Sequence, residues 1–113
     1  MAGKVRTGLV GCGPRGIYVA GLFQKNPYCE VTAVMDRFRM PAEAAAKELG
    51  VPEKQVYADF EKMLREAPVD ALYFACDPLV QVDMACRAMK EGKHVCTDVP
   101  NFRAGHRADL QRR

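Results

Sequence analysis

The chain has 113 residues, of which 49% are hydrophobic and 27% are charged, a composition typical of one globular domain. No apolar stretch is long enough to span a membrane, and residues 1–4 (M-A-G-K) lack the apolar core of a signal peptide, so we expect a cytoplasmic protein without membrane contacts. The net charge is +3, but residues 103–113 carry the whole surplus. A nucleic-acid-binding domain spreads a basic face over its fold, so nucleic acid is not an expected partner.

The first half of the chain predicts two strands, each followed by a helix. Residues 5–10 predict a strand, and a helix over 14–25 begins at a proline, whose missing N–H is no loss in a first turn. Residues 30–35 form a mostly continuous apolar run, which is typical of a parallel strand covered on both faces. A helix over 41–49 follows and stops at Gly50, a residue suited to the left-handed C-terminal position.

The second half continues the alternation. A short strand over 55–57 precedes a helix that Asp59 can cap, and a strand over 69–75 follows. A helix begins at residue 78 after a capping Asp77, and Gly92 ends it before a last strand over 94–97. Five apolar residues hold one face of that helix: Leu79, Val82, Ala85, Cys86 and Met89. Strands alternating with helices indicate a parallel sheet with right-handed crossovers, for which we expect the strand order 3-2-1-4-5.

A glycine-rich turn joins the first strand to the first helix. This glycine loop, residues 11–16, reads G-C-G-P-R-G and matches G-x-G-x-x-G between a strand and a helix. Gly11 would make the tight turn, Gly13 would let the backbone approach a pyrophosphate, and Gly16 would let the helix pack on the strand. The N-terminal end of the helix stabilises an anion there. Asp36 lies twenty residues past Gly16, where an acid binds the ribose hydroxyls. The sequence therefore predicts an α/β fold, a Rossmann-type doubly wound parallel sheet that binds a dinucleotide.

The ends of the fourth and fifth strands should lie on the same ligand edge of the sheet as the glycine loop. The predicted cofactor-binding residues are Gly11, Cys12, Gly13, Pro14, Arg15, Gly16, Asp36, Arg37, Cys76, Asp77, Pro78, Gln81, Asp98, Val99 and Pro100. Arg15 contacts the pyrophosphate or is simply solvated. Asp36 favours NAD, but Arg37 can grip a 2′-phosphate or stack on the adenine, so we expect NAD and keep NADP as possible.

The five cysteines show no C-x-x-C pair and no spacing typical of a metal site, so we expect free, mostly buried thiols and no metal. Cys12 differs from the others because it lies in the glycine loop at a helix N-terminus, a position that lowers the pKa of a thiol. We still predict a passive role for Cys12 and assign no catalytic residue.

Residues 84–95, M-A-C-R-A-M-K-E-G-K-H-V, together with the glycine loop and Asp36, carry a family resemblance. Over residues 5–100 the chain resembles the N-terminal half of the glucose–fructose oxidoreductase, inositol dehydrogenase and rhizopine-catabolism family (Gfo/Idh/MocA). The resemblance implies the NAD(P)-binding domain of an oxidoreductase that transfers a hydride to or from a sugar or cyclitol-like alcohol. We expect a dinucleotide-binding domain over residues 1–100 and a basic tail over 101–113, as a short helix or disordered.

The sequence departs from this family in three ways. The family's E-K-P triplet, whose lysine is its usual acid/base group, stands here as Asp98-Val99-Pro100, and valine cannot move a proton. Gln81 occupies the place of a common histidine. The chain is expected to be truncated before the family's second domain, which supplies the pocket for a small carbohydrate-like substrate. Two alternatives therefore stay open: a non-catalytic dinucleotide-binding module, or the cofactor domain of an NAD-retaining glycosidase, because some such relatives carry valine in the triplet.

Overall fold

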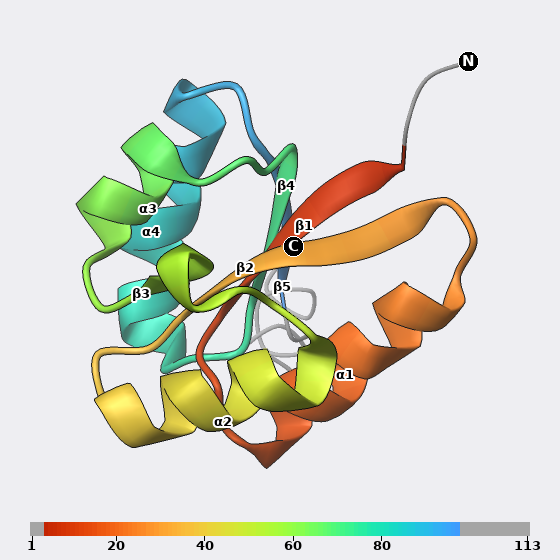
Figure 1. Cartoon of the computed structure of the whole chain (residues 1–113). Helices are drawn as coiled ribbons and strands as arrows, with labels where there is room; N and C mark the ends of the chain where they lie inside the picture. The colour runs from red at the N-terminus through yellow and green to blue at the C-terminus, as the bar shows by residue number, and fades with distance from the viewer. Residues whose placement is uncertain (1–3, 98–113) are drawn as a thin grey trace, which may run out of the picture.

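The computed structural model describes residues 4–97, which form a five-stranded parallel sheet with helices on both faces (Figure 1). The elements are β1 (Val5–Val10), α1 (Pro14–Lys25), β2 (Cys29–Met35), α2 (Arg39–Leu49), a 3-10 turn (Glu53–Gln55), β3 (Val56–Tyr57), α3 (Phe60–Glu66), β4 (Ala71–Phe74), α4 (Pro78–Lys90) and β5 (His94–Thr97). The strand order is β3-β2-β1-β4-β5, so the predicted topology is confirmed. Residues 98–113, which include the predicted basic tail over 101–113, lie outside the described part of the chain.

Two hydrophobic clusters cover the two faces of the sheet. Helices α1 and α2 pack on one face, which Leu9 and Tyr73 help to form, and α3 and α4 pack on the other with Val10 and Phe74 (Figure 1). Adjacent residues of one strand serve opposite clusters because successive side chains of a strand point to opposite faces. The central strands are therefore buried on both sides, as their apolar runs predict.

Most predicted boundaries agree with the structure to within two residues, and the capping residues explain where several helices begin and end. Gly50 adopts the left-handed conformation (φ +73°) at the end of α2. The Asp77 side chain accepts a hydrogen bond of 2.9 Å from the backbone N–H of Leu79 at the start of α4. Asp59 holds the N-cap position of α3 but makes no side-chain capping hydrogen bond.

The predicted apolar face of α4 is buried only at Ala85, and its other four residues are exposed. Leu79, Val82 and Met89 are 87%, 55% and 56% exposed, and Cys86 is exposed as well. The residues that face the sheet are Gln81, Met84, Ala85 and Ala88. Two alanines allow the helix to approach the sheet closely, and this packing outweighs the larger apolar area of the neighbouring stripe. Arg87 pairs with Glu61 of α3, so the exposed apolar stripe lies on the flank of α4 turned away from α3.

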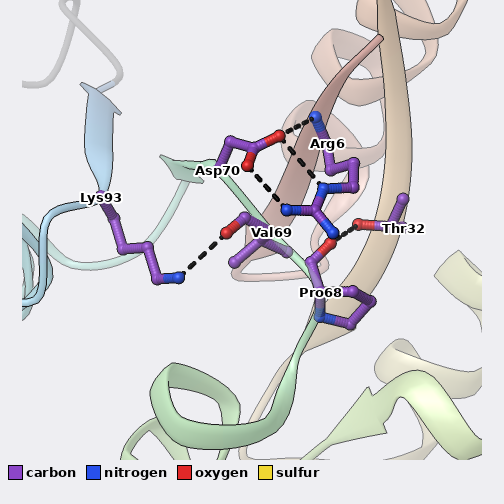
Figure 2. A network of polar contacts seen from close by, with 6 residues as sticks. All are labelled: Arg6, Thr32, Pro68, Val69, Asp70 and Lys93. Atoms are coloured by element: carbon purple, nitrogen blue, oxygen red, sulfur yellow. Dashed lines mark hydrogen bonds and ion pairs between the residues drawn. The ribbon is translucent and has the colours of Figure 1, made fainter. Parts of the chain in front are cut away.

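Polar contacts hold together the amino edge of the sheet, which lies opposite the carboxyl ends of the strands (Figure 2). The Arg6 guanidinium donates to both carboxylate oxygens of Asp70 at 2.8 and 3.2 Å, and the Arg6 backbone N–H donates to the same carboxylate at 2.9 Å. Two further contacts are Thr32 Oγ1 to the Pro68 carbonyl (2.8 Å) and Lys93 Nζ to the Val69 carbonyl (3.0 Å). The segment that precedes β4 is thereby tied to β1, β2 and β5, because Lys93 lies next to β5 (Figure 2).

Asp70 gives the fold a defined dependence on acid. The hydrogen bonds from Arg6 lower the pKa of Asp70 from 3.8 to about 2. A carboxyl whose pKa is lower in the folded state stabilises the fold above its unfolded pKa, and this contribution is lost as the pH falls through the folded pKa. We expect the urea midpoint of the unsubstituted chain to exceed that of Asp70→Asn at pH 5 and the gap to close between about pH 4 and pH 2. A gap that is constant over this range would contradict the assignment to Asp70.

Candidate functional site

A cavity of about 400 Å³ opens at the carboxyl edge of the sheet, where β1, β2 and β4 end. Seven predicted cofactor-binding residues line it: Gly11, Cys12, Gly13, Asp36, Arg37, Cys76 and Asp77. They come from the glycine loop, from the turn after β2 and from the turn before α4. The cavity therefore lies beside β1 at the topological switch point, where the chain order of the strands reverses direction across the sheet.

The three glycines of the motif differ in what a side chain at each position would meet. Gly11 has φ +96°, and a Cβ there would lie 2.4 Å from the Ala75 carbonyl oxygen. A Cβ on Gly16 would lie 2.4 Å from the Gly11 carbonyl oxygen, so the fold itself requires both glycines. Gly13 has an ordinary φ of −75°, and a Cβ there would meet nothing within 4 Å. The protein therefore places no demand for glycine at position 13, which faces open space in the cavity.

Hydrogen bonds fix the glycine loop against the end of β2. The Gly11 N–H donates to the Met35 carbonyl at 2.9 Å, and the Cys12 N–H donates to Asp36 Oδ2 at 2.9 Å. The other carboxylate oxygen, Asp36 Oδ1, accepts from the Phe38 N–H at 2.9 Å. Helix α1 has no acidic residue in its first turn and no side-chain cap at Gly13, so its positive end is uncompensated by an acid of its own. This end suits an anionic ligand.

Both cavity thiols have a pKa that is raised above that of a free cysteine. Burial, followed by the nearby Asp36 carboxylate, raises the pKa of Cys12 to about 12. The expectation that the helix N-terminus lowers this pKa is wrong, because Cys12 is only 2% exposed and the Asp36 carboxylate lies nearby. Burial and the carboxylates of Asp77 and Asp36 also raise the pKa of Cys76. The predicted passive role of Cys12 fits these surroundings.

Other predicted residues lie beside the cavity or cannot be placed. Pro14, Arg15 and Gly16 form the first turn of α1, and Pro78 begins α4. Gln81 is fully buried on the inner face of α4, and its side-chain oxygen and nitrogen have no hydrogen-bond partner in the part of the chain that the structure describes. The triplet Asp98, Val99 and Pro100 lies outside the described residues.

Sequence reasoning missed several apolar residues that line the cavity, among them Phe38, Val80 and Met84. Phe38 is 60% exposed, and the Arg37 guanidinium carbon lies 5.0 Å from the centre of its ring. The only signal in the sequence is that this aromatic residue follows Asp36 by two positions. A large exposed aromatic side chain at a cavity rim offers a surface on which a planar ring can stack.

Within residues 4–97, no group of three or more histidine, cysteine, aspartate or glutamate side chains is arranged to hold a metal ion. No helix in this range is long and apolar enough to cross a membrane.

A parallel sheet in this order, with a glycine loop entering a helix and an acid at the end of β2, defines the class of nucleotide-binding α/β domains. The sequence model of the family described as "Oxidoreductase family, NAD-binding Rossmann fold" (Gfo/Idh/MocA) matches residues 5–110. The chain therefore belongs to this family, and the resemblance noted from the sequence is confirmed.

Curated relatives include proteins named glycosyl hydrolase family 109 from Streptomyces filamentosus and Saccharopolyspora erythraea. The chain is 36% and 37% identical to them over 103 residues, which is 85% of this chain but only 21% and 22% of theirs. The chain thus spans about a fifth of the length of these relatives.

Among solved structures, the WlbA dehydrogenase of Bordetella pertussis in complex with NADH and UDP-GlcNAcA superposes with a TM-score of 0.78 at 26% identity, covering 87% of this chain and 30% of that protein. The scyllo-inositol dehydrogenase of Lactobacillus casei with NAD(H) and scyllo-inositol gives 0.74 at 24% identity, over 96% and 33%. The latter likeness establishes the fold alone.

Gly13 provides a direct test of the cavity as a ligand site. Gly13→Val should leave the chain folded, with a loss of at most about 1 kcal/mol for a poorer N-cap residue, because a Cβ at this position meets no protein atom within 4 Å. The same side chain enters the space that a pyrophosphate would need, so NAD binding measured by calorimetry should be abolished. Gly21→Val is the matched control, since Gly21 lies in α1 with equally open surroundings. Unchanged NAD affinity in Gly13→Val would exclude the cavity as the site.

Proposed function

We propose that this chain binds NAD in the cavity, as the cofactor domain of a dehydrogenase acting on a sugar or cyclitol-like alcohol. The observation that carries the proposal is that Gly13, which the fold leaves free of contacts, and Asp36 line one cavity at the carboxyl edge of the sheet. NAD, when bound, supplies the hydride acceptor, and the protein supplies binding, orientation and electrostatics.

Different residues of this chain would bind different parts of the dinucleotide. The glycine loop with Pro14 and Arg15 would hold the pyrophosphate at the start of α1, and Asp36 would accept hydrogen bonds from the adenosine ribose. Arg37 and Phe38 offer a surface for the adenine ring. The nicotinamide half then falls to the end of β4 and the start of α4, with Cys76, Asp77, Pro78 and Gln81. Asp98, Val99 and Pro100 complete the proposed set.

The substrate class is proposed from the solved relatives. The WlbA dehydrogenase, at 26% identity, holds UDP-GlcNAcA with NADH. The sugar of that ligand carries hydroxyl groups on a six-membered ring, which supports a polyhydroxylated ring as the substrate. Since this chain covers about a third of each solved protein, we place the substrate pocket in a second domain of the longer form.

A second candidate function is glycoside hydrolysis with retained NAD. Relatives named glycosyl hydrolase family 109 at 36% and 37% identity favour it, and so does Val99 in place of the family's lysine. In such an enzyme NAD would take a hydride from the sugar and return it, so sugar is released without net NADH. A non-catalytic dinucleotide-binding module is the third reading. A form extended by its natural C-terminal half, assayed for polyol oxidation and for glycoside cleavage, separates the three.

The 113-residue chain itself should not oxidise alcohols. Val99 cannot accept a proton, and the raised pKa values of the Cys12 and Cys76 thiols do not favour a thiolate base in the cavity. Mixing the purified chain with NAD and a panel of polyols should give no increase in absorbance from NADH above the rate without protein. Steady NADH production from any one polyol would contradict this expectation.

Cofactor choice should favour NAD over NADP by roughly 1–2 kcal/mol, because a 2′-phosphate beside the Asp36 carboxylate meets like charge. Arg37 is the competing group, but its guanidinium lies over the Phe38 ring. We expect Arg37→Ala to weaken NADP more than NAD and Asp36→Ala to narrow the preference. Dissociation constants for both cofactors at one salt concentration measure this, and tighter NADP binding by the unsubstituted chain would show that Arg37 dominates.

We also propose a cytoplasmic location. The five cysteines are free thiols, a state that a reducing compartment maintains.

A further inference from the structure

The Asp36 carboxylate accepts hydrogen bonds from two backbone segments, the glycine loop and the turn after β2, which are distant in the sequence. Oδ2 accepts from the Cys12 N–H of the glycine loop and Oδ1 accepts from the Phe38 N–H, both at 2.9 Å. Cys12 is only 2% exposed although it lines the cavity, so its backbone N–H is shielded from bulk water. The carboxylate is thus the hydrogen-bond partner of a buried loop amide even before a ligand is present.

We propose that Asp36 positions the glycine loop for the pyrophosphate of the dinucleotide, a role separate from its contact with the ribose hydroxyls. This inference rests on the proposed NAD-binding function and deepens it. Without the carboxylate, the Cys12 N–H is a buried donor that lacks a partner, which is unfavourable unless the loop moves. A loop that moves to reach another acceptor no longer presents Gly13 and the start of α1 to the phosphates in the same arrangement.

The packing around the loop explains why Cys12 is the peptide that needs this support. Gly11 is already fixed by the hydrogen bond from its N–H to the Met35 carbonyl. The Gly13 carbonyl accepts from the Ile17 N–H at 3.0 Å as the first bond of α1. Cys12 lies between these two fixed residues. Its backbone N–H donates to the Asp36 carboxylate, and its thiol faces the Met35 carbonyl.

Two ligands separate the two roles of Asp36. ADP has both ribose hydroxyls and the pyrophosphate, whereas 2′,3′-dideoxy-ADP keeps the pyrophosphate and adenine but has no hydroxyl for a carboxylate to bind. A residue that acts through the ribose alone has no effect on the dideoxy ligand. A residue that positions the loop affects both.

Two substitutions separate hydrogen bonding from charge. Asp36→Asn and Asp36→Ala both remove the negative charge that repels a phosphate, but only asparagine keeps an acceptor oxygen for the Cys12 N–H. By calorimetry at one pH and salt concentration, we expect Asp36→Ala to bind dideoxy-ADP roughly five- to thirty-fold more weakly than Asp36→Asn. Asp59→Asn and Asp59→Ala form the matched control pair, since Asp59 makes no capping bond and lies outside the cavity. This pair should show equal affinities.

Hydrogen exchange in the unsubstituted, ligand-free chain supplies a second measurement that does not depend on a variant folding. The Cys12 amide should exchange slowly although its loop borders an open cavity. Rapid exchange at Cys12, or equal dideoxy-ADP affinity in Asp36→Asn and Asp36→Ala, would overturn the positioning role. If the unsubstituted chain still binds NAD in that case, the proposed function stands. Failure of the unsubstituted chain to bind NAD or ADP overturns the proposed function, and this inference with it.

Discussion

The junction between β1 and α1 is the constraint on which the rest of the structure depends. Gly11 has a positive φ, and a Cβ there would collide with the Ala75 carbonyl. A Cβ on Gly16 would collide with the Gly11 carbonyl. These contacts turn the chain sharply enough for α1 to return along β1 while its N-terminal end stays at the carboxyl edge of the sheet. Side chains at these two positions would push apart β1, β4 and α1, so the cavity and the sheet share one set of contacts.

The two edges of the sheet are stabilised by different means. At the amino edge, ionic and polar contacts such as Arg6 with Asp70 tie β4 to its neighbours (Figure 2). At the carboxyl edge, much of the polar bonding goes to backbone groups of the glycine loop and the turn after β2. Stabilising contacts at the amino edge leave the opposite edge free to present backbone donors and an open cavity. This division is the usual one for α/β sheets, in which ligands bind beyond the carboxyl ends of the strands.

The fold could be predicted from the sequence because its signals are local. The glycine loop, the apolar runs and the caps at Gly50 and Asp77 each depend on a few neighbouring residues, and right-handed crossovers then fix the strand order. The buried face of α4 could not be predicted, because its small alanines and the larger apolar stripe beside them both satisfy helical spacing. The high pKa of Cys12 could not be predicted from the sequence either. Its main cause is burial of the thiol in the folded protein, and its second cause, the Asp36 carboxylate, comes close only through the pairing of β1 with β2.

Gly13 has a consequence for the history of such domains. A substitution at this position adds a Cβ that meets no protein atom within 4 Å. Selection for folding alone therefore places little constraint on position 13, and selection for a bound ligand is what preserves the glycine. A duplicated copy of this domain released from its reaction can drift into a folded protein without cofactor in one step, whereas loss of Gly11 or Gly16 removes the fold together with the site.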